Sequence, residues 1–358
     1  MILTNTTNYF SEFIAYFSDT LGWGLGGEIL AYILITVVYL AFFAVSGLYL
    51  VYLERRVAAF FQLRLGPNRV GPWGLLQTIA DAIKLLSKEI FGTDRKDKLL
   101  YHVAYYLVII SALITLSVIP FSYGISAYDI DIGVFFISAV SSVGVLGLVI
   151  GGWGSNNKYS LLGAMRSGLQ MISYELSSGL AILTIVLMAG SLQLSEIISQ
   201  QQAGWFIWRG HIPALIAFMI FVISGTAESN RVPFDLPEGE AELGAGYHTE
   251  YSGMAFAWFF LAEFINMFII SSVGVTLFFG GWLAPFGITD SLGMPWLWGF
   301  IWFFIKVGLI IFLLMWFRWT FPRLRIDQLL TLEWKYLLPI GLVNIILMAV
   351  LVYYQLVF

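Results

Sequence analysis

The feature that most constrains this chain is a series of eight long apolar segments. A helix needs roughly 20 largely apolar residues to cross a bilayer, because its backbone polar groups must be satisfied within the segment. Hydrophobic residues make up 59% of the chain and charged residues only 11%, which is too apolar for a water-soluble domain. The pattern predicts an all-α polytopic membrane protein that forms a single integral membrane domain over residues 1–358. The eight predicted transmembrane helices lie near 30–53, 102–121, 133–153, 171–190, 213–228, 254–280, 297–317 and 337–357.

The distribution of Lys and Arg predicts the orientation of these spans. Residues 1–29 contain neither Lys nor Arg, so the first apolar run is interpreted as a span and not as a cleaved signal peptide. Every basic residue except Arg209 and Lys306 falls in one alternating set of loops. Because basic loops stay in the cytoplasm, we expect both termini on the outer side, in a bacterial inner (plasma) membrane.

Residues 72–91 have a different pattern. Apolar residues recur there at helical spacing, and polar residues occupy the opposite face. Such a helix lies on the membrane surface and does not cross it. The sequence therefore predicts an amphipathic surface helix after the first span. Its apolar face contains Leu75, Leu76, Ile79, Ile83, Leu86 and Ile90, and its polar face contains Gln77, Asp81, Lys84 and Lys88.

Two carboxyl groups lie inside predicted spans. Glu175 occurs in the fourth span and Glu263 in the sixth. Carboxylates at this depth are costly, usually face a protein interior or a water-filled cavity, and often mark ion paths. Burial also favours their neutral forms, so proton exchange comes within reach of working pH. A proton path is thus predicted. The alternative is that each carboxyl group only packs against a neighbouring helix through hydrogen bonds.

The most acidic stretch follows the fifth span and forms a predicted cytoplasmic loop over 229–252. Pro233 and Pro237 prevent a continuous helix there, and interspersed apolar residues indicate partial burial. Acidic groups this close raise one another's pKa values and titrate as a coupled set, which suits a proton relay. The alternative is a solvated loop that faces water or a basic partner. The acidic residues are Glu228, Asp235, Glu238, Glu240, Glu242 and Glu250.

A second cluster of charges closes the first span. Arg55 and Arg64 lie there among aromatic residues, including Phe60 and Trp73. Such a segment could form an amphipathic portal where Arg meets the headgroup of an amphiphile whose tail stays in lipid. Ordinary anchoring by basic residues on the cytoplasmic side explains the same pattern.

Several kinds of site are excluded or unsupported. The chain contains no Cys, which rules out disulfides, thiolate metal sites and clusters held by cysteine sulfur. The three histidines, His102, His211 and His248, lack metal-ligand spacing and are interpreted as packing residues. The glycines within 22–27 precede a span, so they fail the context of a dinucleotide-binding turn. We therefore expect no cofactor or metal bound by this chain, and no nucleic-acid partner.

Two long motifs, ERRVAAFFQLRLGPNRVGPWGLLQTIADAIKLLSKE and ESNRVPFDLPEGEAELGAGYHTEYSG, resemble the signature regions of the H-subunit family of NADH-quinone oxidoreductase, respiratory complex I. That family includes mitochondrial NADH dehydrogenase subunit one. The resemblance continues through GSNNKYSLLGAMRS, SYEL and RLRIDQLL, and so covers essentially the whole chain.

The resemblance implies an eight-span subunit that forms the entrance and part of the quinone cavity of a proton-pumping complex. Quinone would be the substrate, and flavin and iron–sulfur clusters would lie in partner subunits. The implied partners are peripheral-arm subunits, small membrane subunits, antiporter-like subunits and membrane lipid. The implied proton path contains Glu175, Glu228, Glu238, Glu240, Glu242, Glu250, Glu263 and Asp81. The implied quinone cavity or entry contains Arg55, Arg231, Phe234 and Asp235.

One departure and three alternatives accompany this interpretation. Some relatives carry a glutamate in the third span where this chain has Ser142, so the relay would depend on Glu175 or on water. A related membrane anchor of a hydrogenase or ferredoxin-linked complex would lack a quinone site. A self-contained secondary transporter would contain inverted repeats, and none is evident in the sequence. A purely structural anchor would tolerate neutral substitutions of the buried carboxyl groups. No complete redox site is expected in this chain alone.

Overall fold

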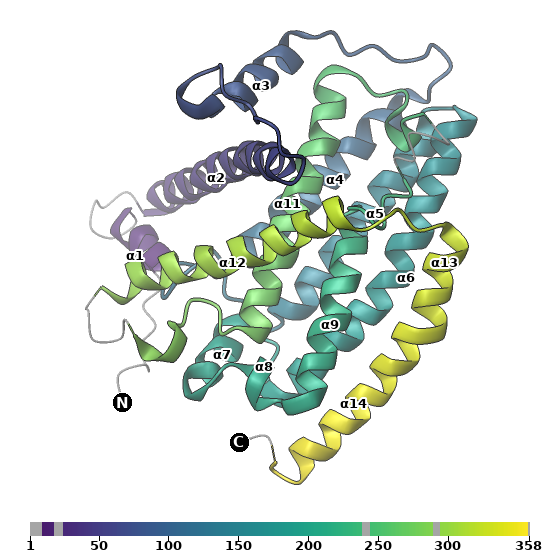
Figure 1. Ribbon diagram of the computed structural model, residues 1–358. Coiled ribbons are helices and arrows are strands. Elements are labelled where there is room, and N and C mark those ends of the chain that lie inside the picture. The colour runs from purple at the N-terminus through teal and green to yellow at the C-terminus, as the bar shows by residue number, and fades with distance from the viewer. Residues whose placement is uncertain (1–8, 18–23, 238–243, 289–293, 357–358) are drawn as a thin grey trace.

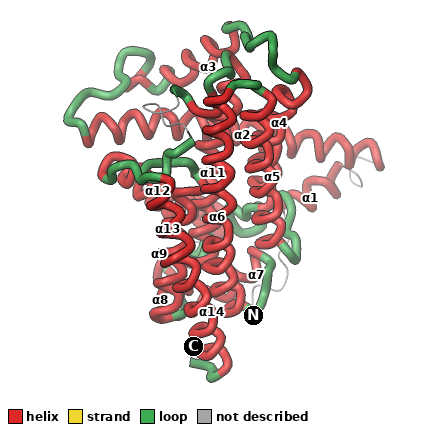
Figure 2. The backbone as a smooth tube through the Cα atoms, turned by 90° about the vertical axis from the view of Figure 1, so that its right-hand side faces the viewer, coloured by secondary structure: helices red, strands yellow, loops and turns green. Residues whose placement is uncertain are grey.

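The computed structural model describes residues 9–17, 24–237, 244–288 and 294–356. Within these ranges the regular structure is helical, apart from one isolated bridge between Ser122 and Ile125 (Figure 2). Eight of the described helical segments are long and apolar enough to cross a membrane. The predicted all-α polytopic fold is thus confirmed.

Seven spans are single helices, and the eighth is a continuous run of three helical segments. The single helices are α2 (Gly24–Phe61), α4 (Lys98–Val118), α5 (Gly133–Gly154), α6 (Lys158–Ala189), α9 (His211–Glu228), α11 (Gly253–Phe278) and α12 (Pro295–Thr320). The eighth consists of α13 (Ile326–Thr331), the π-helical turn η6 (Leu332–Leu337) and α14 (Leu338–Tyr353). The short elements are α1 (Tyr9–Ala15), η2 (Pro72–Gly74), α3 (Gln77–Ser87), α7 (Leu194–Ser199), η3 (Gln200–Ala203), α8 (Phe206–Arg209), η4 (Gly246–His248) and η5 (Pro285–Gly287).

Local sequence explains where several helices begin and end. Asp97 accepts hydrogen bonds from the first backbone N–H groups of α4, and Asn157 caps α6 in the same way. These caps satisfy donors that a helix start leaves unpaired. Gly190 ends α6 with φ of 67°, a left-handed conformation that suits glycine. The helix α6 begins at Lys158, well before the predicted span 171–190. Its first turns are polar, so the search for an apolar run did not include them.

The helices α4, α5, α6, α9, α11 and α14 run alongside one another, whereas α2 and α12 are strongly inclined to them (Figure 1). Small residues allow close approach, as is common between membrane helices. At Gly147 of α5, for example, an added Cβ would lie 3.0 Å from the carbonyl oxygen of Ala104 in α4. One large hydrophobic cluster fills the bundle, and a smaller one surrounds the stacked rings of Tyr101 and Tyr251.

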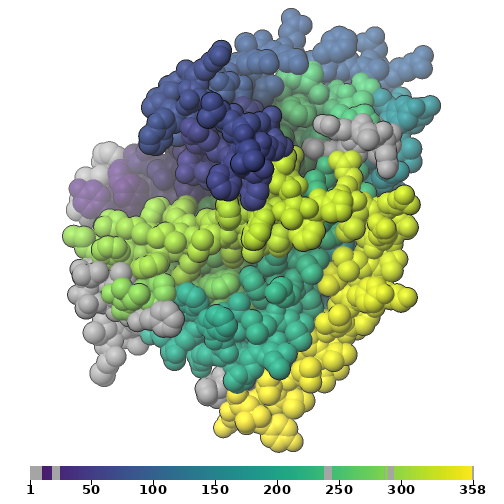
Figure 3. Space-filling view, in the orientation of Figure 1, coloured from purple at the N-terminus to yellow at the C-terminus, as the bar shows by residue number. Residues whose placement is uncertain are grey.

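The predicted surface helix is present as α3, which is shorter than the predicted 72–91 and follows the separate turn η2. Its apolar side chains remain exposed in the isolated chain, with Ile83 at 60% and Leu86 at 65%. Figure 3 shows the dark-blue segment around α3 bordering α12 on one face of the molecule. An exposed apolar face on a short amphipathic helix fits contact with lipid or with another subunit.

Candidate functional site

A cavity of about 350 Å³ lies beside the end of α2, and we call it the α2 cavity. Its walls come from α2, from the segment before α3, from α11 and from the end of α12. They combine apolar and aromatic surface with charged groups, the usual composition of a ligand pocket. The lining residues are Val51, Glu54, Arg55, Ala58, Ala59, Arg64, Leu65, Gly66, Pro67, Phe260, Phe264, Arg318 and Trp319.

A triad of charged side chains, of which Glu54 and Arg231 are buried, supports one wall of the α2 cavity. The carboxylate of Glu54, which is 8% exposed, accepts a hydrogen bond of 2.7 Å from Nη1 of Arg231 and another from Nη1 of Arg318. Arg231 is 5% exposed, and its guanidinium carbon lies 4.2 Å from the ring centroid of Phe264. Its Nε and Nη2 atoms have no hydrogen-bond partner among the described residues. Arg231 itself does not line the α2 cavity, but its ion-pair partner Glu54 and its ring partner Phe264 do.

Arg55, which was predicted for the quinone entry, forms an ion pair with Asp81, which was predicted for the proton path. Nη1 of Arg55 donates to Oδ2 of Asp81 at 2.7 Å, which links α2 to the surface helix α3. Both side chains are more than one third exposed, so solvent screens the pair and its contribution to stability is small. Arg55 lines the α2 cavity, and Asp81 lies behind it at the surface.

Phe234 and Asp235 are buried in the segment that follows α9. Phe234 packs against the ring of Tyr174 at 5.2 Å, away from the described lining of the α2 cavity. Asp235 accepts a hydrogen bond of 2.6 Å from Arg323 in the segment between α12 and α13. Burial raises the pKa of Asp235 above its ordinary value, and the guanidinium of Arg323 opposes that shift. The pair joins two loops at the same end of the bundle.

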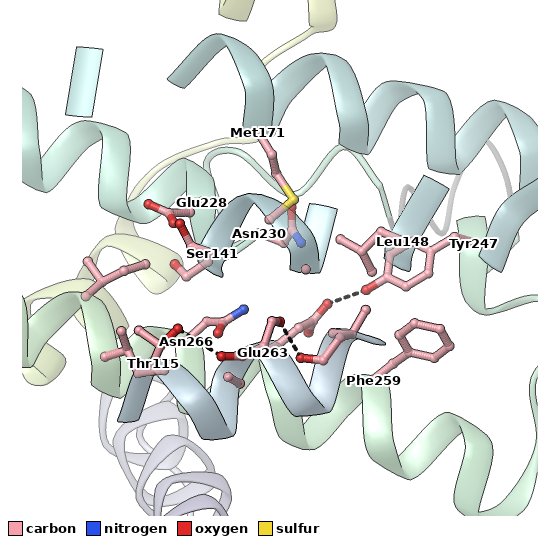
Figure 4. A pocket seen from close by; sticks show the side chains of 17 residues that line it. Thr115, Ser141, Leu148, Met171, Glu228, Asn230, Tyr247, Phe259, Glu263 and Asn266 are labelled. Atoms are coloured by element: carbon pink, nitrogen blue, oxygen red, sulfur yellow. Dashed lines mark hydrogen bonds between the residues drawn. The ribbon is translucent and has the colours of Figure 1, made fainter. Parts of the chain in front are cut away.

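A second, smaller cavity of about 30 Å³ lies inside the bundle between α4, α5, α6, α9 and α11. We call it the α11 cavity. It has room for a small number of water molecules and enough polar groups to hold them. Glu228 and Glu263 enter it from opposite sides, with Asn230 and Asn266 between them (Figure 4). Two predicted path residues therefore face one water-sized space.

Glu263 has two neighbours that the sequence interpretation missed. The hydroxyl of Tyr247 donates to Oε1 of Glu263 at 2.7 Å, and Nε2 of His248 lies 3.8 Å from the same oxygen. His248 was interpreted as a packing residue, but the structure places it against a buried carboxyl group. The adjacent aromatic and basic residues Tyr247 and His248 in a highly acidic segment were the available signal.

Glu175 lies on α6, near the α11 cavity but outside its lining. Ser142 of α5 donates to Oε1 of Glu175 at 2.8 Å. Ser142, which was singled out as a departure from the family pattern, is thus a direct hydrogen-bond partner of Glu175. The relay was expected to depend on Glu175 or on water. Glu175 is also close enough to Glu228 for their charges to interact.

Glu250 has a different setting from the other predicted carboxyl groups. It accepts hydrogen bonds from Asn157, at 2.6 Å, and from Thr93, while its backbone oxygen accepts one of 2.9 Å from Tyr101. These contacts join three loops at one end of the bundle. Glu250 lines neither cavity. The predicted path residues Glu238, Glu240 and Glu242 lie outside the described residues.

Both cavities are lined in part by residues of α11. Glu263 lines the α11 cavity and the next residue, Phe264, lines the α2 cavity. Arg231 lies over the Phe264 ring and also interacts electrostatically with Glu263.

Within the described ranges, no group of three or more His, Cys, Asp or Glu side chains is arranged to hold a metal ion. The arginine and aromatic groups of the α2 cavity suit ligand binding, and the carboxyl, hydroxyl and imidazole groups around the α11 cavity can exchange protons.

Comparison with known proteins identifies the family of the chain. The NADH dehydrogenase family model matches residues 34–349. The H subunit of NADH-quinone oxidoreductase from Bacteroides fragilis is 55% identical over 330 residues, which are 91% of this chain and 92% of the relative. The H subunit from Rickettsia prowazekii is 50% identical, with 86% and 89% covered, and NADH-quinone oxidoreductase subunit 8 of Rhodothermus marinus is 49% identical, with 84% and 91% covered. The resemblance inferred from the two motifs is confirmed, and the chain belongs to the NADH dehydrogenase family.

Proposed function

We propose that this chain is the membrane subunit of a proton-translocating NADH:quinone oxidoreductase that receives quinone in the α2 cavity. It would act within a complex whose partner subunits carry flavin and iron–sulfur clusters and whose antiporter-like subunits move protons. The names of the relatives at about half identity support the complex. The basic loops support an orientation with these loops in the cytoplasm and both termini outside, in a bacterial plasma membrane.

The observation that carries this proposal is the composition of the α2 cavity. Its volume lies at the small end of the usual range for ligand pockets. The aromatic wall from Phe260, Phe264 and Trp319 suits a flat ring, and Arg55 and Arg64 supply donors for carbonyl oxygens. The surface helix α3 beside it presents apolar side chains to lipid, which suits the entry of a hydrophobic tail.

Proton coupling is proposed to run through Arg231. Reduction of a quinone in the α2 cavity changes the charge beside Glu54 and Phe264, both of which contact Arg231. Glu263 responds because it lies within electrostatic range of the Arg231 guanidinium. Protons then pass between Glu263, water in the α11 cavity, Glu228 and Glu175. The proposed wider path also includes Asp81, Glu250, Glu238, Glu240 and Glu242, whereas Asp235 and Phe234 are proposed for the surroundings of the quinone.

A photoreactive quinone tests the binding site in the intact complex. We expect covalent labelling of the peptides around Arg64–Pro67 and Phe260–Phe264, and competition by substrate quinone. The substitution Phe260→Trp should fill the cavity, reduce labelling and raise the KM for quinone. The surface substitution Glu89→Gln serves as the control. Labelling confined to other regions of the complex would refute the assignment.

A further inference from the structure

The last span carries a buried carboxyl group that neither cavity contains. Glu333 lies on the π-helical turn η6 and is completely buried. Its sequence context, in a run of apolar and aromatic residues, gave no reason to select it. Single π-helical turns within α-helices occur often at functional sites, and an acidic group at this depth is costly enough to need an explanation.

The contacts of Glu333 are asymmetric. Its Oε2 accepts a hydrogen bond of 2.9 Å from Ser177 of α6, whereas its Oε1 is buried with no hydrogen-bond partner among the described residues. A neighbouring titratable group is Tyr174, whose hydroxyl donates to the backbone oxygen of Leu329 at 3.4 Å. An unmade hydrogen bond at a buried oxygen is expensive, so the unsatisfied Oε1 of Glu333 calls for an explanation.

Two serine hydroxyls connect Glu333 to the main path. The Oγ atoms of Ser177 and Ser224 lie 3.0 Å apart, and either can be the donor. Each hydroxyl both donates and accepts, so the direction of the chain can reverse. When Glu333 is ionised, Ser177 donates to it; when Glu333 is protonated, it can donate to Ser177, which then donates to Ser224. The arrangement can therefore pass a proton in either direction.

Ser224 lies four residues before Glu228, on the same face of α9. Residues at this spacing have Cβ atoms about 5–6 Å apart, a separation that one bridging water can span. The hydrogen-bonded chain from Glu333 through Ser177 thus ends at Ser224, one helical turn before Glu228, which lines the α11 cavity.

We propose that Glu333, through the hydroxyls of Ser177 and Ser224, is a proton-exchanging side branch of the carboxylate path at Glu228. This inference rests on the proposed function, since it requires that Glu228 exchange protons during turnover. No bond other than O–H is made or broken: a proton leaves one oxygen as another oxygen accepts it, and Glu333 alternates between its neutral and ionised forms.

The test uses the assembled complex reconstituted in vesicles, with assembly of each variant verified first. Glu333→Gln keeps the shape of the side chain but removes the exchangeable carboxyl proton. Ser224→Ala interrupts the hydroxyl chain without touching the bond between Ser177 and Glu333. Asn344→Leu is the matched control, because Asn344 is a buried polar residue on the following helix α14 and carries no acid.

We expect Glu333→Gln and Ser224→Ala to lower coupled quinone reduction and proton pumping several-fold, whereas Glu333→Asp restores most of both. Redox-triggered infrared difference spectra should lose a carboxyl C=O band in Glu333→Gln, a change that a packing defect would not cause. Asn344→Leu should retain the band and the rates. Equal losses in Asn344→Leu, or an unchanged spectrum in Glu333→Gln, would overturn the inference.

Glu228→Gln separates this inference from the proposed function. If Glu228→Gln stops pumping while Glu333→Gln leaves rates and spectrum unchanged, the side branch is refuted and the function stands. If both variants pump and turn over normally, the proposed proton path itself is refuted, and the side branch falls with it.

Discussion

The charged triad on the wall of the α2 cavity gives the sharpest energetic prediction. In Glu54→Gln the side chain keeps its shape and one acceptor oxygen but loses its charge, so Arg231 and Arg318 are left as like charges without a counterion. A hydrogen bond to a charged group contributes about 1.5–3 kcal/mol, which we assign to the pair with Arg231 because both groups are buried. Arg318 has a side chain that is 32% exposed, so its share is reduced by screening to at most about 1 kcal/mol.

The expected loss in the free energy of unfolding is therefore roughly 2–4 kcal/mol. Unfolding of the chain in mixed lipid–detergent micelles, followed by tryptophan fluorescence, measures it. In a double-mutant cycle, Arg231→Met combined with Glu54→Gln should cost less than the sum of the two single changes, since the uncompensated guanidinium is removed.

Glu89→Gln is the matched control, because Glu89 is an exposed carboxylate on a nearby loop. It should change the free energy of unfolding by no more than about 0.5 kcal/mol. A loss in Glu54→Gln no larger than in this control, or strict additivity with Arg231→Met, would refute the reasoning that the triad is a coupled, desolvated unit.

Three further predictions follow from other contacts. Burial holds the pKa of Asp235 above its ordinary value, so the folded chain binds this proton more tightly than the unfolded chain. The free energy of unfolding should therefore fall as pH rises from the pKa of Asp235 in the unfolded chain to its pKa in the folded chain. Arg323→Gln should extend this fall to higher pH, which a pH series of unfolding measurements would show. Gly163→Ala should lower the free energy of unfolding by about 1–3 kcal/mol, because its Cβ would lie 2.8 Å from the backbone N of Tyr247. It should also slow quinone-dependent pumping, since Tyr247 donates to Glu263; unchanged pumping would contradict this. Lys306→Met should lower the unfolding free energy by about 1.5–3 kcal/mol, since the Lys306 ammonium donates to three backbone carbonyls after α11.

The fold was predictable because its main determinant is local. Apolar runs of sufficient length specify spans whatever their neighbours, and the helical spacing of Ile79 and Ile83 specifies the surface helix. The apolar runs alone did not give the extents of the helices, because α4 and α6 begin at the caps Asp97 and Asn157, which lie outside those runs. The separate turn η2, which shortens α3 relative to 72–91, depends on a Pro-Gly stretch whose geometry is set by contacts.

The candidate site was predictable only in part, because its pairings are distant in sequence. Arg231 was selected from its motif, but its partner Glu54 lies 177 residues away, and no pattern in one sequence indicates such a pairing. His248 and Glu333 were missed for the same reason. His248 is an isolated histidine, and Glu333 is an isolated acidic residue near the start of the last span. Only the packing of α6, α9 and α11 shows what each of them contacts.

The central claim is that charge in the α2 cavity acts on Glu263 through Arg231 and so drives proton movement at Glu228. The most direct measurement compares quinone reduction with proton pumping in assembled complexes that carry Glu228→Gln, Glu263→Gln or the control Glu89→Gln. The account predicts that both buried substitutions strongly lower pumping and coupled turnover, whereas the control retains them. Full retention of both activities in the two buried variants would contradict the account and leave this chain a scaffold.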